Sequence, residues 1–387
     1  MDDKPTIDYL NKLPVEIWRE ILFAIPSHPI LDASESTDPL IFLHSGSVRG
    51  SGIIRVQRQK LALMKVCKTM YPLAEQLLYS KVSLGSRALQ NGTFQAAAMA
   101  QVVGGSRRRG ELTTHMWVTY VYTPFERFDL RITCPNLRSF RDSFGHSPFL
   151  SLIRMKNEGW SLGITTLTLE NTDFNWESMR IVAVCFPRLT TFSLLDAARN
   201  AGDVTQPISF PLLHAVTIHS FVFQVFPFDN LQLPSLKWMR ICGIITEDGD
   251  YFHAIYRSTS SNLVGLQVDN IPSDAPLQWV PNVVFGSLKQ LKTYICPLTQ
   301  HTPNALLGTL PTHPPHDLEN LIFTIQAGTN ISYLQHYANY FSSQSLFPCL
   351  KRVSLAFSLH DTRTPLLFLD AAKELFSHAT VDVVRKY

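Results

Sequence analysis

Apolar residues recur along most of the chain in a six-residue pattern whose first, fourth and sixth positions are apolar. Clear copies begin at Ile164, Leu189, Leu213, Leu236, Leu263, Leu288, Leu318 and Leu350, and a weaker copy begins at Leu137. Positions four and six have the period of a β-strand, whose alternate side chains point to one side. Each copy therefore predicts one strand that buries its apolar side by stacking on the neighbouring copies.

The segments between the copies predict corners and helices. A proline stands two residues ahead of five copies, at Pro135, Pro187, Pro211, Pro234 and Pro348. Proline fixes the backbone and lacks an N–H donor, which suits a corner ahead of a short strand. We expect connecting helices over 176–186, 248–257 and 330–341. A final amphipathic helix over 364–379 is expected to cap the stack.

Positions three, five and seven of each copy are expected to face away from the core, on the open side of the strands. Trp, Arg and Tyr, the residue types that most often dominate interface energies, occur there in adjacent copies. The pattern predicts a substrate-binding surface made of His219, Trp238, Arg240, Gln267, Asp269, Lys292 and Tyr294. The alternative is that these side chains are ordinary surface or are covered by a connector.

The first 83 residues have a different pattern. Pro14 stands at the first position of a predicted short helix whose apolar stripe runs through Ile17 and Ile21. A second helix is predicted over 61–71, with a break at Pro72 and a third helix over 73–79. Three helices this short bury little surface alone, so this module needs a partner or the repeats to pack against.

The repeats resemble the leucine-rich-repeat architecture, in an irregular form, and the N-terminal module resembles the F-box. The F-box elements read Leu13–Ile17 (LPVEI), Val66–Met70 (VCKTM) and Leu78–Val82 (LYSKV). Met70 stands where the family has an aromatic residue, and the connector over about 26–58 is far longer than usual. The resemblance implies docking on a Skp-type adaptor, and through it on a cullin scaffold, by Leu13, Pro14, Ile17, Ile21, Leu22, Leu63, Val66, Cys67 and Leu78.

These observations predict an α/β protein: a short three-helix F-box followed by a leucine-rich-repeat solenoid. The F-box spans 8–83 with the insertion at about 26–58, a linker and entry to the solenoid spans 84–130, and the repeats span 131–387. The implied function is substrate recognition in an SCF-type E3 ubiquitin ligase, with the repeats binding an unknown target protein. The alternatives are a repeat scaffold with no ubiquitin link and an enzyme with an unrecognised site.

Composition adds limits to this interpretation. The chain has 387 residues, of which 45% are hydrophobic and 17% charged, and its net charge is +3. An apolar content this high predicts a folded chain, and the weak net charge does not favour a nucleic-acid binder. The only basic cluster, Arg107–Arg109, is interpreted as a solvated linker, with a localisation signal or a phosphate contact as alternatives.

The acidic N-terminus predicts a cytoplasmic or nuclear protein, because it lacks the basic and apolar segments of a secretory signal. The longest apolar run, 221–228, is too short to span a membrane. The six cysteines form no CxxC pair and are expected to be buried thiols rather than disulfides.

Catalytic and metal-binding motifs are missing from the sequence. GxSxG, HExxH, the P-loop and GxGxxG do not occur. His313 and His316 stand close together, but no third histidine or cysteine ligand is adjacent in the sequence. We therefore expect no enzyme activity, no cofactor and no metal.

Overall fold

The computed structural model describes residues 61–62, 71–85, 93–119, 130–143, 159–170, 173–195, 198–199, 206–219, 230–242, 262–269, 288, 290–298, 317–325, 329–342, 347–358 and 364–386. The chain divides into two compact units. The first comprises Met1–Phe144 and Asn157–Ile164, and the second comprises Gly145–Lys156 and Thr165–Tyr387.

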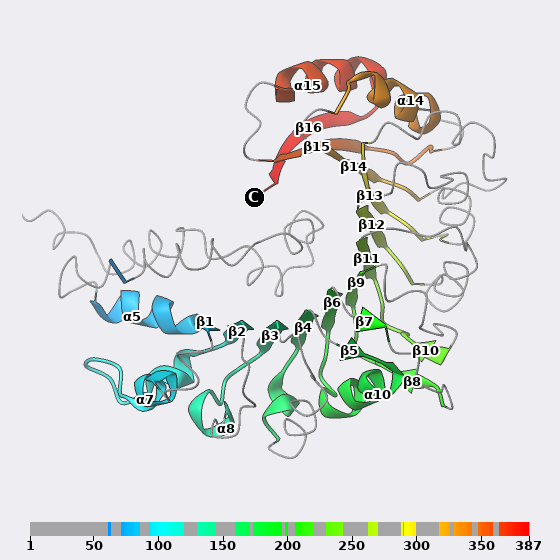
Figure 1. The fold of residues 1–387 in the computed structure, drawn as a ribbon. Helices are drawn as coiled ribbons and strands as arrows, with labels where there is room; N and C mark the ends of the chain where they lie inside the picture. The colour runs from blue at the N-terminus through cyan, green and yellow to red at the C-terminus, as the bar shows by residue number, and fades with distance from the viewer. Residues whose placement is uncertain are drawn as a thin grey trace, which may run out of the picture. The chain divides into compact units, whose positions relative to one another are not determined.

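Strands and short helices alternate in the first unit (Figure 1). Its elements are α5 (Tyr71–Ser80), β1 (Lys81–Gly85), α7 (Thr93–Met99), the 3-10 helix η2 (Arg109–Leu112), β2 (His115–Thr119), α8 (Leu130–Thr133), β3 (Ser139–Ser143) and the 3-10 helix η3 (Trp160–Gly163). Strands β1, β2 and β3 pair in parallel, with Val82, Met116 and Phe140 at the same level. All three side chains are buried, so the core of this unit lies on that face of the strands.

The stack of strands begins earlier than the sequence pattern indicates. Strand β2 lies inside 84–130, the segment predicted as a linker and entry to the solenoid, and it pairs with β3 like any later repeat. Thr113, Met116 and Val118 are buried at the first, fourth and sixth positions of this copy. The copy escaped the apolar pattern because its first position is a threonine, whose hydroxyl donates to the carbonyl of Tyr79 at 2.8 Å.

The basic cluster Arg107–Arg109 is not simply a solvated linker. Nε of Arg109 donates to Oε1 of Glu75 at 2.6 Å, and the other oxygen of Glu75 accepts the backbone N–H of Val103 at 3.0 Å. The guanidinium of Arg109 also lies 5.5 Å from the centre of the Tyr79 ring. Since Glu75 is fully buried, Arg109 is its counterion and ties this loop to α5.

Nine strands of the second unit run parallel and side by side in chain order (Figure 1). They are β4 (Thr166–Glu170), β6 (Thr191–Leu195), β9 (Ala215–His219), β11 (Trp238–Cys242), β12 (Gly265–Asp269), β13 (Thr293–Pro297), β14 (Asn320–Ile325), β15 (Arg352–Ser358) and β16 (Thr380–Lys386). Two short parallel pairs lie in the connectors: β5 (Asp173–Phe174) with β7 (Ala198–Arg199), and β8 (Ile208–Ser209) with β10 (Leu231–Gln232). One strand per sequence copy and parallel pairing confirm a leucine-rich-repeat type of α/β fold.

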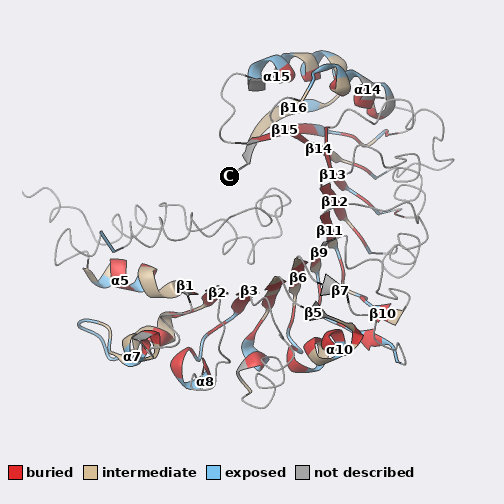
Figure 2. Ribbon diagram, viewed as in Figure 1, coloured by how far each residue is buried: buried red, intermediate tan, exposed pale blue. Residues whose placement is uncertain are grey.

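The apolar positions of the copies form the core of this unit. Leu236, Met239 and Ile241 are the first, fourth and sixth residues of one copy, and all are buried. The register of β11 with β9 and β12 sets each strand residue beside its equivalent in the next copy. Burying one such side chain stabilises the fold by about 1.5–3 kcal/mol. Figure 2 shows buried residues along the stacked strands of this unit.

One copy lies three residues further along than predicted. Strand β13 pairs with β12 so that Tyr294 lies beside Leu266, which makes Leu291, not Leu288, the first position of the copy. Leu288 is buried in the preceding turn, where its carbonyl accepts the N–H of Leu291 at 3.2 Å. Tyr294 is only 5% exposed, with its ring centre 6.5 Å from that of Phe341. The prediction that Tyr294 faces the open side is therefore wrong.

The predicted proline corners are confirmed. Each of the five prolines is exposed in a turn just ahead of a strand. Side chains one residue further on join successive turns: the Ser235 hydroxyl donates to the Pro211 carbonyl at 2.6 Å, and the Asn262 amide donates to the Pro234 carbonyl at 2.7 Å. The corners of adjacent copies are thereby held at a fixed spacing.

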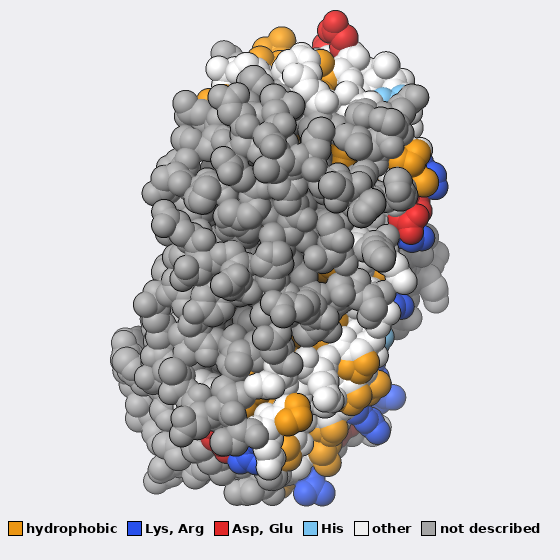
Figure 3. Space-filling model, turned by 90° about the vertical axis from the view of Figure 1, so that its right-hand side faces the viewer, with side chains coloured by type: hydrophobic (Ala, Val, Ile, Leu, Met, Phe, Trp, Pro, Cys, Tyr) orange, Lys and Arg blue, Asp and Glu red, His pale blue; other side chains and the backbone are white. Residues whose placement is uncertain are grey.

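The residue immediately before each strand extends the ladder of backbone hydrogen bonds. Each N–H at this level donates to the equivalent carbonyl of the preceding copy at 2.8–2.9 Å, through Thr190, His214, Lys237, Val264, Lys292, Glu319 and Lys351. Several of these side chains are charged and exposed, and Figure 3 shows basic side chains spaced along one margin of the face it presents.

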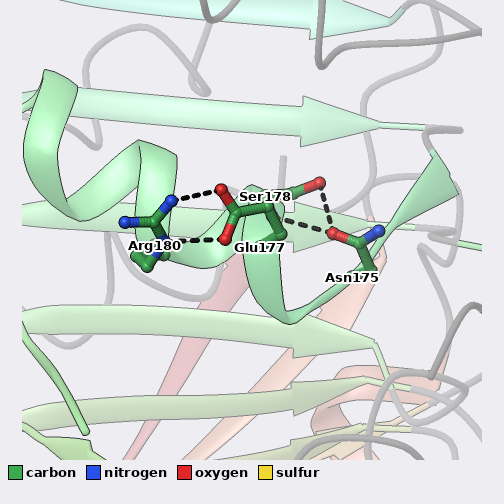
Figure 4. A network of polar contacts seen from close by, with 4 residues as sticks. All are labelled: Asn175, Glu177, Ser178 and Arg180. Atoms are coloured by element: carbon green, nitrogen blue, oxygen red, sulfur yellow. Dashed lines mark hydrogen bonds and ion pairs between the residues drawn. The ribbon is translucent and has the colours of Figure 1, made fainter. Parts of the chain in front are cut away.

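The predicted helix over 176–186 is confirmed as α10 (Trp176–Cys185). Oδ1 of Asn175 caps it by accepting the backbone N–H of Ser178 at 2.8 Å and its hydroxyl at 2.9 Å (Figure 4). On the exposed side, Nε of Arg180 donates to Oε2 of Glu177 at 2.6 Å. The cap satisfies a first-turn N–H, and the buried side of the helix, which includes Met179, packs on the core.

The two predicted C-terminal helices are present as α14 (Ser332–Phe341) and α15 (Thr364–Leu375). Phe341 at the end of α14 packs on Phe347 and Phe323, with ring centres 5.1 and 6.4 Å away. Helix α15 packs against α14, β15 and β16. The strand β16 follows it, so the expected capping helix is not the last element of the stack.

Several predicted elements lie outside the described residues: the helix at Pro14, most of the helix over 61–71, the insertion over 26–58 and the helix over 248–257. The third predicted N-terminal helix is α5, which begins at Tyr71 with Pro72 in its first turn, where proline is tolerated. No helix in the described ranges is both long and apolar enough to cross a membrane.

Candidate functional site

A cluster of polar side chains lies on the face of β11 and β12 opposite the core. Because strand side chains alternate, this face carries the residues between the buried anchors. The register places three residues of β11 beside three of β12, as the pairs Trp238 with Gly265, Arg240 with Gln267 and Cys242 with Asp269.

An ion pair forms the centre of the cluster. Nε and Nη2 of Arg240 each lie 2.6 Å from Oδ2 of Asp269, and Arg240 is only 3% exposed. Burial alone would lower the pKa of the Arg240 guanidinium, but the Asp269 carboxylate outweighs it and raises that pKa above its usual value. The cluster therefore carries a permanently charged, paired arginine with no net charge.

Two further donors contact the Asp269 carboxylate. Nε2 of Gln267 donates to Oδ1 at 2.8 Å and to Oδ2 at 3.0 Å, and Sγ of Cys242 lies 3.6 Å from Oδ2. Burial raises the pKa of the Cys242 thiol to about 12, so it stays protonated and can donate. The Gln267 amide is fixed by these bonds, which leaves its buried Oε1 without a hydrogen-bond partner in the part of the chain that the structure describes.

The indole of Trp238 lies across the backbone of Gly265. A Cβ atom at Gly265 would fall 1.9 Å from Cζ3 of the indole, so only glycine fits beneath the ring. Trp238 is half-buried, whereas its neighbours in the cluster are buried. It offers a fixed aromatic surface beside a neutralised charge pair.

Four of the seven predicted substrate-binding residues come together in this cluster: Trp238, Arg240, Gln267 and Asp269. His219 ends β9 at the register position beside Cys242. Lys292 does not join the cluster, because it precedes β13 and is exposed.

Ile295 lies beside Gln267, the position that the sequence pattern assigned to Lys292. It is nearly fully buried although it lies on the face opposite the core. A second copy of the pattern begins at Leu291, 28 residues after Leu263 and 27 before Leu318, and this spacing could have placed Ile295 correctly.

Of the nine predicted adaptor-binding residues, the structure describes only Leu78, which is half-buried in α5. The other eight lie outside the described residues: Leu13, Pro14, Ile17, Ile21, Leu22, Leu63, Val66 and Cys67.

The first unit carries a second polar cluster on the equivalent face of β2 and β3. The guanidinium of Arg141 lies 4.2 Å from the centre of the Trp117 ring, and the indole N–H donates to the Ser143 hydroxyl at 3.0 Å. Burial lowers the pKa of His115 to about 4, and Lys81 at the same level has a pKa lowered by burial to about 8. The sequence pattern missed this cluster because it placed β2, which carries Trp117, in a linker.

Within the described ranges, no three His, Cys, Asp or Glu side chains gather in an arrangement that could hold a metal ion. His313 and His316 lie outside those ranges. The Arg240 cluster holds its own charges in hydrogen bonds, and its only thiol is kept protonated.

Comparisons with known proteins add little to this description. No model of a protein family and no curated protein matches the sequence. Among solved structures, the crystal structure of a TLR13–ssRNA13 complex aligns with a TM-score of 0.37 and 14% identity, over 71% of this chain and 40% of that chain. That likeness is weak, and the assignment of a leucine-rich-repeat type of fold therefore rests on the copies in the sequence and on the parallel strand pairing.

Proposed function

We propose that this protein is the substrate-recognition subunit of an SCF-type E3 ubiquitin ligase and is not itself an enzyme. The N-terminal segment binds a Skp-type adaptor, and through it a cullin scaffold, while the repeats bind the protein to be ubiquitinated. The observation that carries the binding role is the rigid cluster at Trp238 on the face of the strands opposite the core.

A repeat stack is well suited to this role. Every copy adds one strand and three side chains to a continuous face, so specificity can be spread over several copies. Trp238 supplies aromatic surface of the kind that dominates interface energies, and Gly265 fixes its ring before a partner arrives. Pre-organisation of this kind lowers the entropic cost of binding.

The ubiquitin link is supported by the three F-box-like segments, which occur in the family's order and are followed by repeats. Of these, Leu78–Val82 spans the end of α5 and the start of β1, where a helix leads directly into the first strand.

Co-precipitation of the full chain with a purified Skp-type adaptor tests this proposal. The wild type is expected to bind, and the double variant Leu13→Asp with Pro14→Ala is expected to lose binding, because a carboxylate cannot enter an apolar contact. Leu366→Asp is the matched control, since Leu366 is 69% exposed on α15. Wild-type protein that leaves the adaptor in solution, or a double variant that retains it, would refute the ubiquitin link.

The second candidate is a repeat scaffold that binds proteins without any ubiquitin link. It is favoured by the same Trp238 cluster, which needs no adaptor. A chain that fails to bind the adaptor but captures a target through Trp238 would establish this function instead. Loss of that target in Trp238→Ala, with no loss in Leu366→Asp, would assign target binding to the Trp238 cluster.

A further inference from the structure

Three exposed lysines occupy the same structural level in the second unit. Lys237, Lys292 and Lys351 each stand immediately before a strand, ahead of β11, β13 and β15. We call these three residues the lysine row. They stand at the starts of the strands, and Lys237 directly precedes Trp238 in the sequence.

The backbone fixes the spacing of the lysine row. The chain of hydrogen bonds runs from Lys237 through Val264, Lys292 and Glu319 to Lys351, with N···O distances of 2.8–2.9 Å. Neighbouring strands lie about 4.7–4.9 Å apart, and successive lysines are two strands apart, which gives a spacing of about 9.5 Å. The lysine side chains move, but the points from which they extend are rigid.

One carboxylate serves two of the three lysines. Glu319 lies between Lys292 and Lys351, with Nζ–Oε distances of 3.5 Å and 3.1 Å. These lysines lower the pKa of the Glu319 carboxyl, mainly through the hydrogen bond from Lys351. Lys237 has no carboxylate partner in the described ranges. The row therefore keeps an excess of positive charge and holds one carboxylate between two ammonium groups.

We infer that the lysine row binds an acidic, extended polypeptide segment of a partner, with a carboxylate at about every third residue. A polyproline II helix advances about 3.1 Å per residue and repeats every three residues, so equivalent side chains recur every ~9.3 Å on one side. That repeat matches the ~9.5 Å spacing of the lysines. The inference goes beyond the proposed function, because it concerns the exposed lysines ahead of the strands and does not depend on adaptor binding.

A nucleic acid is the other polyanion that lysines attract, and two observations favour the peptide. The whole chain carries a net charge of only +3, too little for the long-range field typical of nucleic-acid binders. Glu319 also stands inside the row, where it would repel a continuous phosphate backbone. A peptide can place an uncharged residue opposite it.

Fluorescence anisotropy with the full chain at low ionic strength tests the inference. The probe is a fluorescein-labelled Pro- and Ser-rich peptide with Asp at every third position. A peptide of the same composition with the Asp residues grouped at one end, and a labelled oligo-dT, serve as comparisons. The spaced peptide is expected to bind most tightly.

The variants test whether binding depends on the lysine row or on positive charge in general. Each of Lys237→Ala and Lys351→Ala is expected to weaken binding about two- to fivefold, and the triple variant with Lys292→Ala about tenfold or more. Glu319→Gln is expected to strengthen binding, because its carboxylate competes for two lysines. Lys373→Ala, an exposed lysine on α15, is the matched control and should change nothing.

Three results would overturn the inference: equal binding of the spaced and grouped peptides, a triple variant that binds like wild type, or an equal loss in Lys373→Ala. Tighter binding of oligo-dT with the same dependence on the row would assign the row to nucleic acid instead. Because all five substituted side chains are exposed or half-buried, circular dichroism of each variant should match the wild type.

Discussion

Trp238 and Gly265 form a matched pair across two copies of the repeat, because the indole of one occupies the space that a side chain of the other would fill. An added Cβ at Gly265 would lie 1.9, 2.1 and 2.7 Å from three indole carbons. The register sets the two residues directly opposite each other on β11 and β12. The position of the aromatic surface is therefore determined by a residue 27 positions away in the sequence.

Gly265→Ala is expected to destabilise the protein by about 1–3 kcal/mol, because the ring or the strand must move. Urea unfolding of the full chain, followed by tryptophan fluorescence, measures the change. The matched control is Gly105→Ala, where the nearest atom to an added Cβ is 3.7 Å away. Combining Gly265→Ala with Trp238→Ala should recover part of the loss, and a double variant no more stable than Gly265→Ala would contradict the contact.

Asp269→Ala is expected to cost about 3–5 kcal/mol, because it removes the carboxylate that is paired with the buried Arg240 guanidinium. The paired replacement Arg240→Met with Asp269→Leu should restore most of this stability, since it removes both charges. Glu177→Gln, which breaks an exposed pair with Arg180, is the control and should cost about 0–1 kcal/mol. The midpoint of urea unfolding gives the comparison. Equal effects of Asp269→Ala and Glu177→Gln would show that the cluster is open to solvent.

His115 should make the protein less stable at acid pH. Its pKa is lowered from 6.5 to about 4, first by burial and then by Lys81 and Arg138. Below pH 6.5 the unfolded chain takes up a proton that the folded chain refuses until about pH 4. Stability is therefore fully present above pH 6.5 and falls by about 3 kcal/mol as the pH drops towards 4.

The measurement is the difference in unfolding free energy between pH 7 and pH 4.5, in wild type and in His115→Gln. Since other groups titrate over the same range, only the difference between the two proteins reports on His115. The variant should lose less stability on acidification. An identical pH dependence would show that His115 is accessible to protons in the folded protein.

The buried cysteines should react slowly with alkylating reagents. Burial raises the pKa of Cys134 and Cys242 from 9.0 to about 12 and raises that of Cys296 as well. At pH 8, a rise of three pKa units leaves about a thousandfold less thiolate, the reactive form. Cys349 is only half-buried and should be modified before these three thiols.

Iodoacetamide labelling at pH 8, read peptide by peptide by mass spectrometry, makes this comparison within one sample. Cys134, Cys242 and Cys296 should react at the Cys349 rate only after denaturation in urea. Native labelling of Cys242 as fast as Cys349 would mean that the Arg240 cluster opens to solvent.

The sequence predicts the repeat because its signal is local. Leucines such as Leu236 and Leu263 stand at fixed distances from the strand they introduce, and their burial follows from that spacing alone. The pattern is ambiguous at Leu288 and Leu291, which both begin an acceptable copy. Since strand side chains alternate, a shift by an odd number of residues moves every side chain to the other face, which is why Tyr294 was assigned to the wrong side.

The site is predicted in composition but not in its contacts. The repeat pattern alone places Arg240 and Asp269 on one face of the strands. Their ion pair joins residues 29 positions apart, and it depends on the register that brings them diagonally opposite each other on β11 and β12. The sequence does not predict the role of Gly265, because glycine is needed there only to make room for the ring of Trp238. The cluster at Trp117 and Arg141 was missed for another reason, since Thr113 hid the copy to which β2 belongs.

Because of the hydrogen bonds just ahead of the strands, the geometry of the binding face does not depend on the length of the connectors. Register is set where Lys237 donates to His214 and Val264 donates to Lys237, within two residues of the strands themselves. The segment from Cys242 to Asn262 can therefore gain or lose residues without moving Trp238 relative to Gly265. Evolution can vary the connectors and the strand-borne side chains as independent modules.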